Sequence, residues 1–118
     1  MTAAASESAS VAARRRAVVV AGHSGSVELA RAALGDPDAP VRIVALGATE
    51  RLGVLVDSDL QRALSDPEPS VRRRAAELSA THGDVDLAPA LDDADARVVE
   101  VAAWACGEHE TARDEIVG

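Results

Sequence analysis

Hydrophobic residues recur at helical spacing in three segments of the chain. Counted from the first valine of each segment, apolar residues stand at offsets 0, 4 and 7. The three stripes are Val41, Ala45 and Ala48; Val71, Ala75 and Leu78; and Val98, Ala102 and Ala105. Offsets of this kind place side chains on one face of an α-helix. The pattern therefore predicts three amphipathic helices, each with one buried face.

The three segments are copies of one longer unit. Aligning them on their first valines brings a leucine column and an aspartate column into register, at spacings of 30 and 27 residues. The columns hold Leu34, Leu64 and Leu91, and Asp36, Asp66 and Asp93. A partial fourth copy stands at the front, where "ARRRAVVVAGHSG" from residue 13 matches "VRRRAAELSATHG" from residue 71. Periods of this length are typical of solenoid proteins.

Each unit is predicted to hold a short helix, a tight turn and the striped helix. The short helices are expected at 27–34, 59–64 and 87–91, with N-caps at Ser24 or Ser26, at Asp57, and at Asp84 or Asp86. The turns are "GDPDAP", "SDPEPS" and "DDADA". Gly53 and Gly83 are expected to end striped helices in a left-handed conformation, and Gly107 offers an early end to the third.

A helix pair of this size cannot bury its apolar stripe alone, so neighbouring pairs must stack into a continuous core. The sequence predicts disorder for residues 1–10 and one repeat domain for residues 11–118. The tail "TARDEIVG" resembles the start of a further short helix, with Thr111 as its N-cap. Two explanations of this tail stay open: a terminal cap, or the front half of a longer array.

The recurring "DPDAPVR" and "DPEPSVR" resemble HEAT repeats, and most closely the short bacterial, phycobilisome-lyase-like kind. The resemblance covers residues 11–110. It implies an all-α, right-handed α-solenoid of about three HEAT-like helical hairpins, plus the partial N-terminal one. HEAT arrays serve as scaffolds, adaptors, lyase subunits and, in a few cases, enzymes.

The resemblance also implies a ladder between adjacent repeats, built from the turn aspartate and an arginine of the striped helix. The corresponding residues here are Asp36, Arg42, Asp66, Arg72 and Asp93. The third copy has Val99 in place of the arginine, so the ladder is expected to end there. Each such pair should contribute about 0.2–1 kcal/mol.

Charge and composition narrow the classes of partner. The formal net charge is −8, which argues against general affinity for nucleic acid or anionic membranes. Residues 1–56 carry six arginines and five acids, whereas residues 57–118 carry six arginines and fifteen acids. Cys106 is the one cysteine, so no internal disulfide is expected. The start "MTAAASESAS" lacks the pattern of a signal peptide, and a cytoplasmic protein is expected.

Trp104, the one aromatic residue apart from histidines, is the strongest candidate for a partner-binding residue. It lies at offset 6 of its helix, in a column with Val19, Gly47 and Glu77, away from the apolar stripe. A column at offset 2 holds Arg15, Ile43, Arg73 and Glu100. These two columns predict a surface that binds another protein through Arg15, Ile43, Arg73, Glu100 and Trp104. The alternative is that Trp104 packs on the final helix or on a further repeat.

The remaining candidates for chemistry have ordinary structural explanations. The triplets Arg14–Arg16 and Arg72–Arg74 could bind phosphate or an acidic tail, but consecutive helical residues point about 100° apart. Arg73 and Glu77 stand four residues apart and are expected to neutralise each other. Glu108, His109 and Glu110 are interpreted as a solvated helix end, and Cys106 as a packing residue. No catalytic, metal-binding or cofactor-binding residues are predicted.

The sequence thus favours a non-catalytic scaffold or adaptor that is monomeric or packs with further repeats. The first alternative is an accessory subunit of a lyase-like enzyme complex, which would present a cofactor or substrate to another chain. A weaker alternative is a protein that binds nucleic-acid backbone through the arginine triplets.

Overall fold

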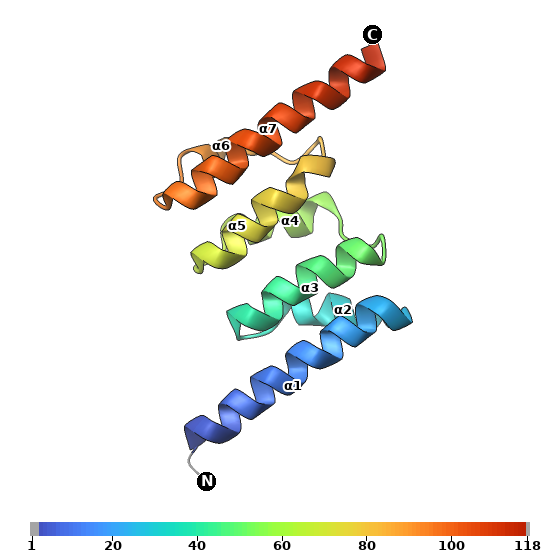
Figure 1. Cartoon of the computed structure of the whole chain (residues 1–118), viewed down its shortest axis with the longest axis vertical. Helices are drawn as coiled ribbons and strands as arrows, with labels where there is room; N and C mark the ends of the chain where they lie inside the picture. Colours follow the sequence, from blue (N-terminus) through green and yellow to red (C-terminus); the bar gives the residue numbers. More distant parts are fainter. Residues whose placement is uncertain (1–2, 118) are drawn as a thin grey trace. The chain divides into compact units, whose positions relative to one another are not determined.

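The computed structural model describes residues 3–117, with side chains described for residues 10–115. The described chain is helical and contains no β-strand, which confirms the predicted all-α class. It divides into two compact units, of which the first ends at Leu55 and the second begins at Val56 (Figure 1). The sequence-based prediction of one repeat domain for residues 11–118 stays a prediction. Disorder is predicted for residues 1–10, whereas the first helix begins at Ala3.

The first unit contains three α-helices and one turn of 3₁₀ helix. In chain order these are α1 (Ala3–Ser24), α2 (Val27–Ala32), η1 (Ala33–Gly35) and α3 (Ala39–Arg51). Helices α1 and α3 pack side by side, and the short helix α2 contacts both of them (Figure 1). Their contact encloses a core of Val18, Ala21, Ala30, Ala33, Val41, Ala45 and Ala48. Small residues therefore let the helices of this unit approach closely.

The closest approach of α1 to α3 occurs at Gly22. A Cβ atom built at Gly22 would lie 3.0 Å from the Ala48 Cβ and 3.1 Å from the Ala48 Cα. A side chain at position 22 would therefore push the two helices apart. The absence of a side chain there fixes the distance at which the two long helices of this unit can pack.

The second unit repeats this plan with four α-helices. They are α4 (Asp57–Ala63), α5 (Pro69–Leu78), α6 (Ala88–Leu91) and α7 (Ala96–Val117), with the 3₁₀ turn η2 (Ser79–Thr81) after α5. Helix α4 packs on α5, α6 packs on α7, and the longer helices α5 and α7 contact each other. The predicted short-plus-long helix order is thus present in this unit.

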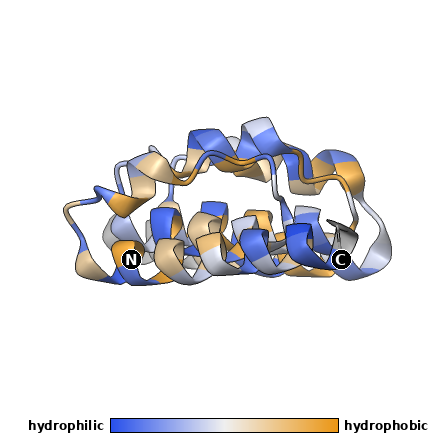
Figure 2. Ribbon diagram, turned by 90° about the horizontal axis from the view of Figure 1, so that it is seen from above, coloured by the Kyte–Doolittle hydropathy of each residue, from blue (hydrophilic) through white to orange (hydrophobic). Residues whose placement is uncertain are grey.

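The predicted apolar stripes are buried in three helices. Val41, Val71 and Val98 at offset 0 are at most 1% exposed, and the alanines at offset 4 are fully buried. Leu78 at offset 7 is half-buried. Hydrophilic and hydrophobic residues alternate along individual helices (Figure 2). Helical periodicity in the sequence therefore identified the buried faces of α3, α5 and α7 correctly.

The aspartate column has one role in the turn of every copy. A carboxylate oxygen of Asp36, Asp66 or Asp93 accepts the backbone N–H two residues on, in each case at 2.9 Å. This bond closes the turn before the long helix begins. Prolines in the first turns of α3 and α5 suit the start of a helix because no helical partner exists there for their missing N–H.

The helix ends match the prediction at Gly53 but not at Gly83. Gly53 has a φ of 72° directly after α3, and Gly25 has a φ of 88° after α1. In the described chain, left-handed glycine conformations occur at these two positions and not at Gly83. The prediction for Gly83 is wrong because α5 already ends at Leu78 and tightens into η2.

The tail does not form the separate helix predicted to start at Thr111. Helix α7 runs without a break from Ala96 to Val117 and passes through Gly107. The Thr111 hydroxyl donates a hydrogen bond of 3.0 Å to the backbone carbonyl of Gly107, four residues earlier. Thr111 is therefore a residue of the helix interior and not an N-cap. The hydroxyl bonds back into its own helix, as threonine often does there.

The predicted side-chain N-caps also differ from the observed ones. Ser26 is the N-cap residue of α2 but makes no capping side-chain bond. At α4 the carboxylate of Asp59 accepts the N–H of Val56 at 3.1 Å, and before α6 the carboxylate of Asp86 accepts the N–H of Ala88 at 3.0 Å. An aspartate thus binds a backbone N–H group at the start of both helices. At α6 it is Asp86, one of the two predicted residues, whereas at α4 it is Asp59 and not the predicted Asp57.

Candidate functional site

Trp104 is strongly exposed for a tryptophan, with 52% of its surface accessible. It lies on α7 four residues after Glu100, which is also exposed. Arg73, likewise exposed, lies on α5, the helix that packs against α7. Three of the five predicted partner-binding residues therefore lie on two adjoining helices of the second unit. The alternative, in which Trp104 is buried against the chain's own end, does not occur in the described structure.

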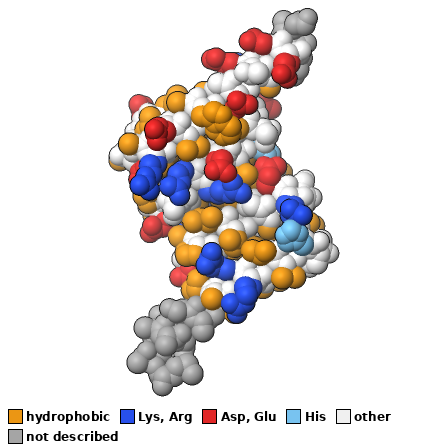
Figure 3. All heavy atoms as spheres, in the orientation of Figure 1, with side chains coloured by type: hydrophobic (Ala, Val, Ile, Leu, Met, Phe, Trp, Pro, Cys, Tyr) orange, Lys and Arg blue, Asp and Glu red, His pale blue; other side chains and the backbone are white. Residues whose placement is uncertain are grey.

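The other two predicted residues lie on adjoining helices of the first unit. Arg15 on α1 is exposed, and Ile43 on α3 is half-buried. A shallow hollow of about 400 Å³ lies beside them, lined by Ala12, Arg15, Arg16, Val19, Val20 and Val44. Val19 is 46% exposed and Val20 is 62% exposed. Hydrophobic and basic side chains lie next to one another over this unit (Figure 3).

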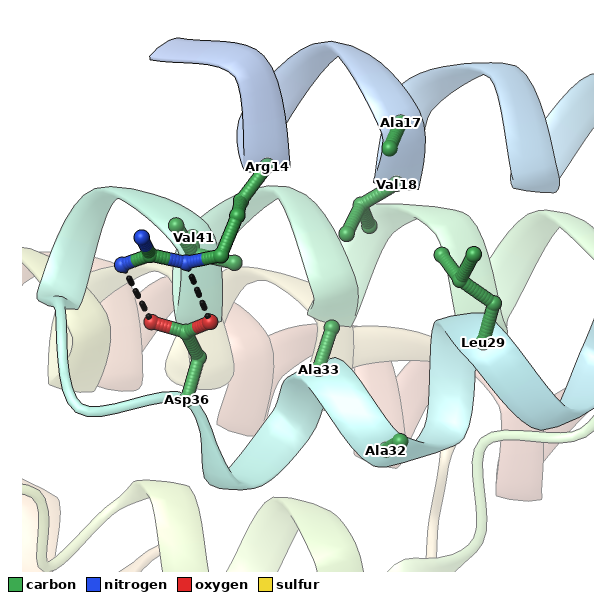
Figure 4. A pocket seen from close by; sticks show the side chains of 8 residues that line it. All are labelled: Arg14, Ala17, Val18, Leu29, Ala32, Ala33, Asp36 and Val41. Atoms are coloured by element: carbon green, nitrogen blue, oxygen red, sulfur yellow. Dashed lines mark hydrogen bonds and ion pairs between the residues drawn. The ribbon is translucent and has the colours of Figure 1, made fainter. Parts of the chain in front are cut away.

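In both units an arginine of a long helix makes a two-point ion pair with the aspartate of the next turn. In the first unit, Arg14 Nε and Nη2 lie 3.0 and 3.3 Å from the carboxylate oxygens of Asp36 (Figure 4). In the second, Arg72 Nε and Nη2 lie 2.8 and 3.1 Å from those of Asp93. Arg14 also contacts the carboxylate of Asp38. Paired N–H donors suit a carboxylate geometrically, so these contacts hold the helix against the turn.

The ladder expected between adjacent repeats placed Asp36 with Arg42 and Asp66 with Arg72, and in the second unit Arg72 pairs with Asp93 of the next copy. Arg42 donates to the backbone carbonyls of Asp36 and Pro37 at 3.0 and 3.1 Å. Arg72 binds the carbonyl of Asp66 in the same way, at 2.9 Å, while its other nitrogens reach Asp93. An arginine therefore closes its own turn through a backbone carbonyl and can reach forward to the aspartate of the following copy.

Both ion pairs shift the pKa values of their members. The hydrogen bond to Asp93 raises the pKa of Arg72, and the same bond lowers the pKa of Asp93 below 3.8 although burial opposes this shift. For Asp36, burial raises the pKa, but the hydrogen bonds from Arg14 and the Asp38 backbone N–H outweigh burial and lower it. The two carboxylates are therefore held in their charged forms.

The arginine triplets do not act as continuous basic stripes. Arg14 and Arg72 are used in the ion pairs, and Arg74 contacts the carboxylate of Glu77. The predicted partner of Glu77 was Arg73, which instead is exposed. The prediction is wrong because Arg74 reaches Glu77 from three residues away, along the same helix face. Each triplet thus leaves fewer unpaired arginines than its sequence suggests.

His109 is buried, contrary to the predicted solvated helix end. Its side chain is 6% exposed, and its Nε2 lies 2.7 Å from the backbone carbonyl of Ser79. Glu108 and Glu110 on either side are exposed, as expected. The signal was present in the sequence, because His109 stands at offset 11 from Val98 and continues the stripe of offsets 0, 4 and 7. The imidazole therefore ties α7 to η2.

Among the described residues, no group of three or more His, Cys, Asp or Glu side chains is arranged to hold a metal ion. Cys106 is a half-buried free thiol. His82 lies 3.3 Å from a carboxylate oxygen of Asp57 in an exposed pair. Among the described helices, none combines the length and apolar character needed to cross a membrane.

No protein-family model matches the chain, and no curated protein sequence matches it.

Proposed function

We propose that the chain is a non-catalytic, HEAT-like helical-repeat module that binds another protein through the exposed faces of its long helices. The observation that carries the proposal is the 52% exposure of Trp104, the one tryptophan of the chain. Tryptophan is enriched among the residues that contribute most to protein–protein binding, because one side chain buries a large area with few rotatable bonds.

The charged residues on the same two helices as Trp104 are suited to the polar rim of such an interface. Exposed Glu100 and Arg73 supply charges of both signs on the adjoining helices α7 and α5. An apolar centre with a polar rim is the usual composition of a protein-binding surface. We expect the partner to offer an apolar pocket for the indole ring with charged groups around it.

Repetition within the chain supports the HEAT-like part of the proposal. The turn aspartate makes the same 2.9 Å bond in three copies, and the forward ion pair recurs in both units. The involvement of Arg14, Arg72 and Arg74 in ion pairs argues against binding of nucleic-acid backbone, since phosphate contacts require available cations.

Trp104→Ala is expected to weaken partner binding by at least about tenfold without lowering the melting temperature, because the side chain is half exposed. The test is an affinity purification with the wild-type chain, Trp104→Ala and Leu91→Ala, followed by titration of the recovered partner. Leu91 is 41% exposed on α6 and serves as the matched control. Equal recovery of the same partners by all three chains would contradict the proposal.

A further inference from the structure

Helix α1 exposes residues of the stripe at offsets 0, 4 and 7, which the other long helices bury. Its alignment with α5 places Ala13, Ala17 and Val20 at offsets 0, 4 and 7. Ala13 and Ala17 are exposed, and Val20 is 62% exposed. The corresponding residues of α5 at offsets 0 and 4, Val71 and Ala75, are at most 1% exposed. Among the described residues, no short helix precedes α1 and covers this face.

The exposed stripe of α1 borders an apolar hollow against α2. The hollow measures about 260 Å³ and is lined by Arg14, Ala17, Val18, Leu29, Ala32, Ala33, Asp36 and Val41. Ala17 and Val18 approach it from α1, while Leu29 and Ala33 approach it from the α2 side (Figure 4). The ion pair of Arg14 with Asp36 closes one end. We call this feature the α1–α2 groove.

The apolar character of α2 departs from the other copies. Val27 and Leu29 are 37% and 44% exposed. In the repeat alignment their columns contain acids, Asp57 with Asp84 and Asp59 with Asp86. Leu29 cannot accept the backbone N–H bonds that Asp59 and Asp86 accept at the same position of the other copies. It adds apolar surface to the groove.

The second unit shows what fills the equivalent space. There the long helix is α5, the next short helix is α6, and α4 packs on α5. The side chain of Gln61 on α4 donates to the backbone carbonyl of Asp86 at 2.8 Å and accepts the Asp86 N–H at 3.0 Å, just before α6. Leu60 and Leu64 of α4 are 0% and 5% exposed. A short helix with leucines four residues apart therefore occupies this position.

We propose that the α1–α2 groove binds a short amphipathic helix of another protein, in the way that α4 packs within the second unit. The bound helix carries aliphatic residues four positions apart, which enter the hollow beside Ala17 and Leu29. It also carries an acidic residue at the edge that faces away from α2, because the exposed Arg16 precedes Ala17 on α1 and lines the hollow on the other side of the exposed stripe. The α1–α2 groove belongs to the first unit, whereas Trp104 belongs to the second.

A second copy of the chain fits this groove less well than a foreign helix. A stable protein interface buries roughly 800 Å² on each partner. Of the residues that line the groove, the exposed ones are Ala17, Leu29 and Ala32, which favours a small contact such as one short helix. A two-fold contact would also bring Arg16 of both copies to the same interface, with like charges opposed. A helix with an acidic edge removes that repulsion.

The proposal is tested with a stapled helical peptide that carries the sequence of residues 55–66, since so short a peptide is hardly helical unaided. The full-length, isotope-labelled chain is titrated with it, and amide chemical shifts are followed. We expect saturable changes confined to α1 and α2. A peptide with aspartate in place of both leucines, Leu60→Asp and Leu64→Asp, should cause none.

Matched variants of the chain locate the site. Ala17→Glu should abolish the shift changes, whereas Ala103→Glu, at an exposed alanine of α7, and Trp104→Ala should leave them intact. Both alanines are exposed, so each variant should keep the wild-type melting temperature. Absence of binding at about 1 mM peptide, or binding that survives Ala17→Glu, overturns the proposal. A dimer in sedimentation that Ala17→Glu dissociates overturns it in favour of self-association.

Discussion

Leu60→Ala is expected to destabilise the second unit by about 2–5 kcal/mol, the range for loss of a buried leucine side chain. Leu60 is completely buried on α4, a helix of seven residues that is far too short to persist without packing. Alanine at this position removes apolar contacts and leaves a cavity among small side chains that cannot fill it. Urea denaturation followed by circular dichroism measures the loss.

Leu91→Ala is the control for this variant, because the same side chain is removed from a 41% exposed site on α6. Its effect should stay within about 0.5 kcal/mol, as for most surface substitutions. Trp104 is the one tryptophan and lies in the second unit, so its fluorescence reports on that unit. Equal destabilisation by the two variants would show that α4 does not anchor the unit.

The features that could be predicted from the sequence depend on local periodicity and turn chemistry. Apolar offsets of 0, 4 and 7 identified the buried faces of α3, α5 and α7, because a helix repeats every 3.6 residues wherever it lies. The aspartate column indicated three turns because each carboxylate binds a backbone N–H only two residues away. Such contacts lie within a few residues of one another in the chain.

The wrong predictions concern contacts between different helices, or residues whose side chain can form either of two local hydrogen bonds. Arg14 finds Asp36 across 22 residues, and His109 finds the carbonyl of Ser79 across 30 residues. Neither pair could be predicted from a single copy of the repeat, because its two residues lie in different copies. Thr111 can cap a new helix or bond back into an existing one, and here its hydroxyl bonds to the Gly107 carbonyl of the same helix.

The exposure of the candidate partner-binding residues could be predicted from the sequence, but the exposed stripe of α1 could not. Exposure of Trp104, Arg73, Glu100 and Arg15 follows from their offsets away from the apolar stripe. The exposed stripe of α1 could not be predicted in this way, because Ala13 and Ala17 have the same periodicity as their buried counterparts. Burial depends on whether a short helix precedes the long one, and periodicity within the long helix does not contain that information.

Asp93→Ala is expected to destabilise the second unit by about 2–4 kcal/mol at pH 7, because three hydrogen bonds to a charged group are lost together. The carboxylate accepts Arg72 Nε at 2.8 Å, Arg72 Nη2 at 3.1 Å and the Asp95 N–H at 2.9 Å. Asp92→Ala at the exposed neighbouring position should change stability little. A double-mutant cycle that combines Asp93→Ala with Arg72→Ala measures the coupling energy of the ion pair. A coupling energy near zero would contradict a stabilising role of the pair.

The same contact predicts how stability depends on pH. The folded pKa of Asp93 is lowered below 3.8, chiefly by the hydrogen bond from Arg72. A carboxyl group with a lowered folded pKa stabilises the fold fully above its unfolded pKa, and this contribution disappears as the pH falls through the folded value. The stability difference between wild type and Asp93→Asn should therefore be constant near neutrality and shrink below about pH 4, in urea unfolding measured at successive pH values. A difference that persists unchanged at the acid end would mean that the charge of Asp93 does not stabilise the fold. The Asp95 N–H bond could not account for such a difference, because an asparagine can also accept it.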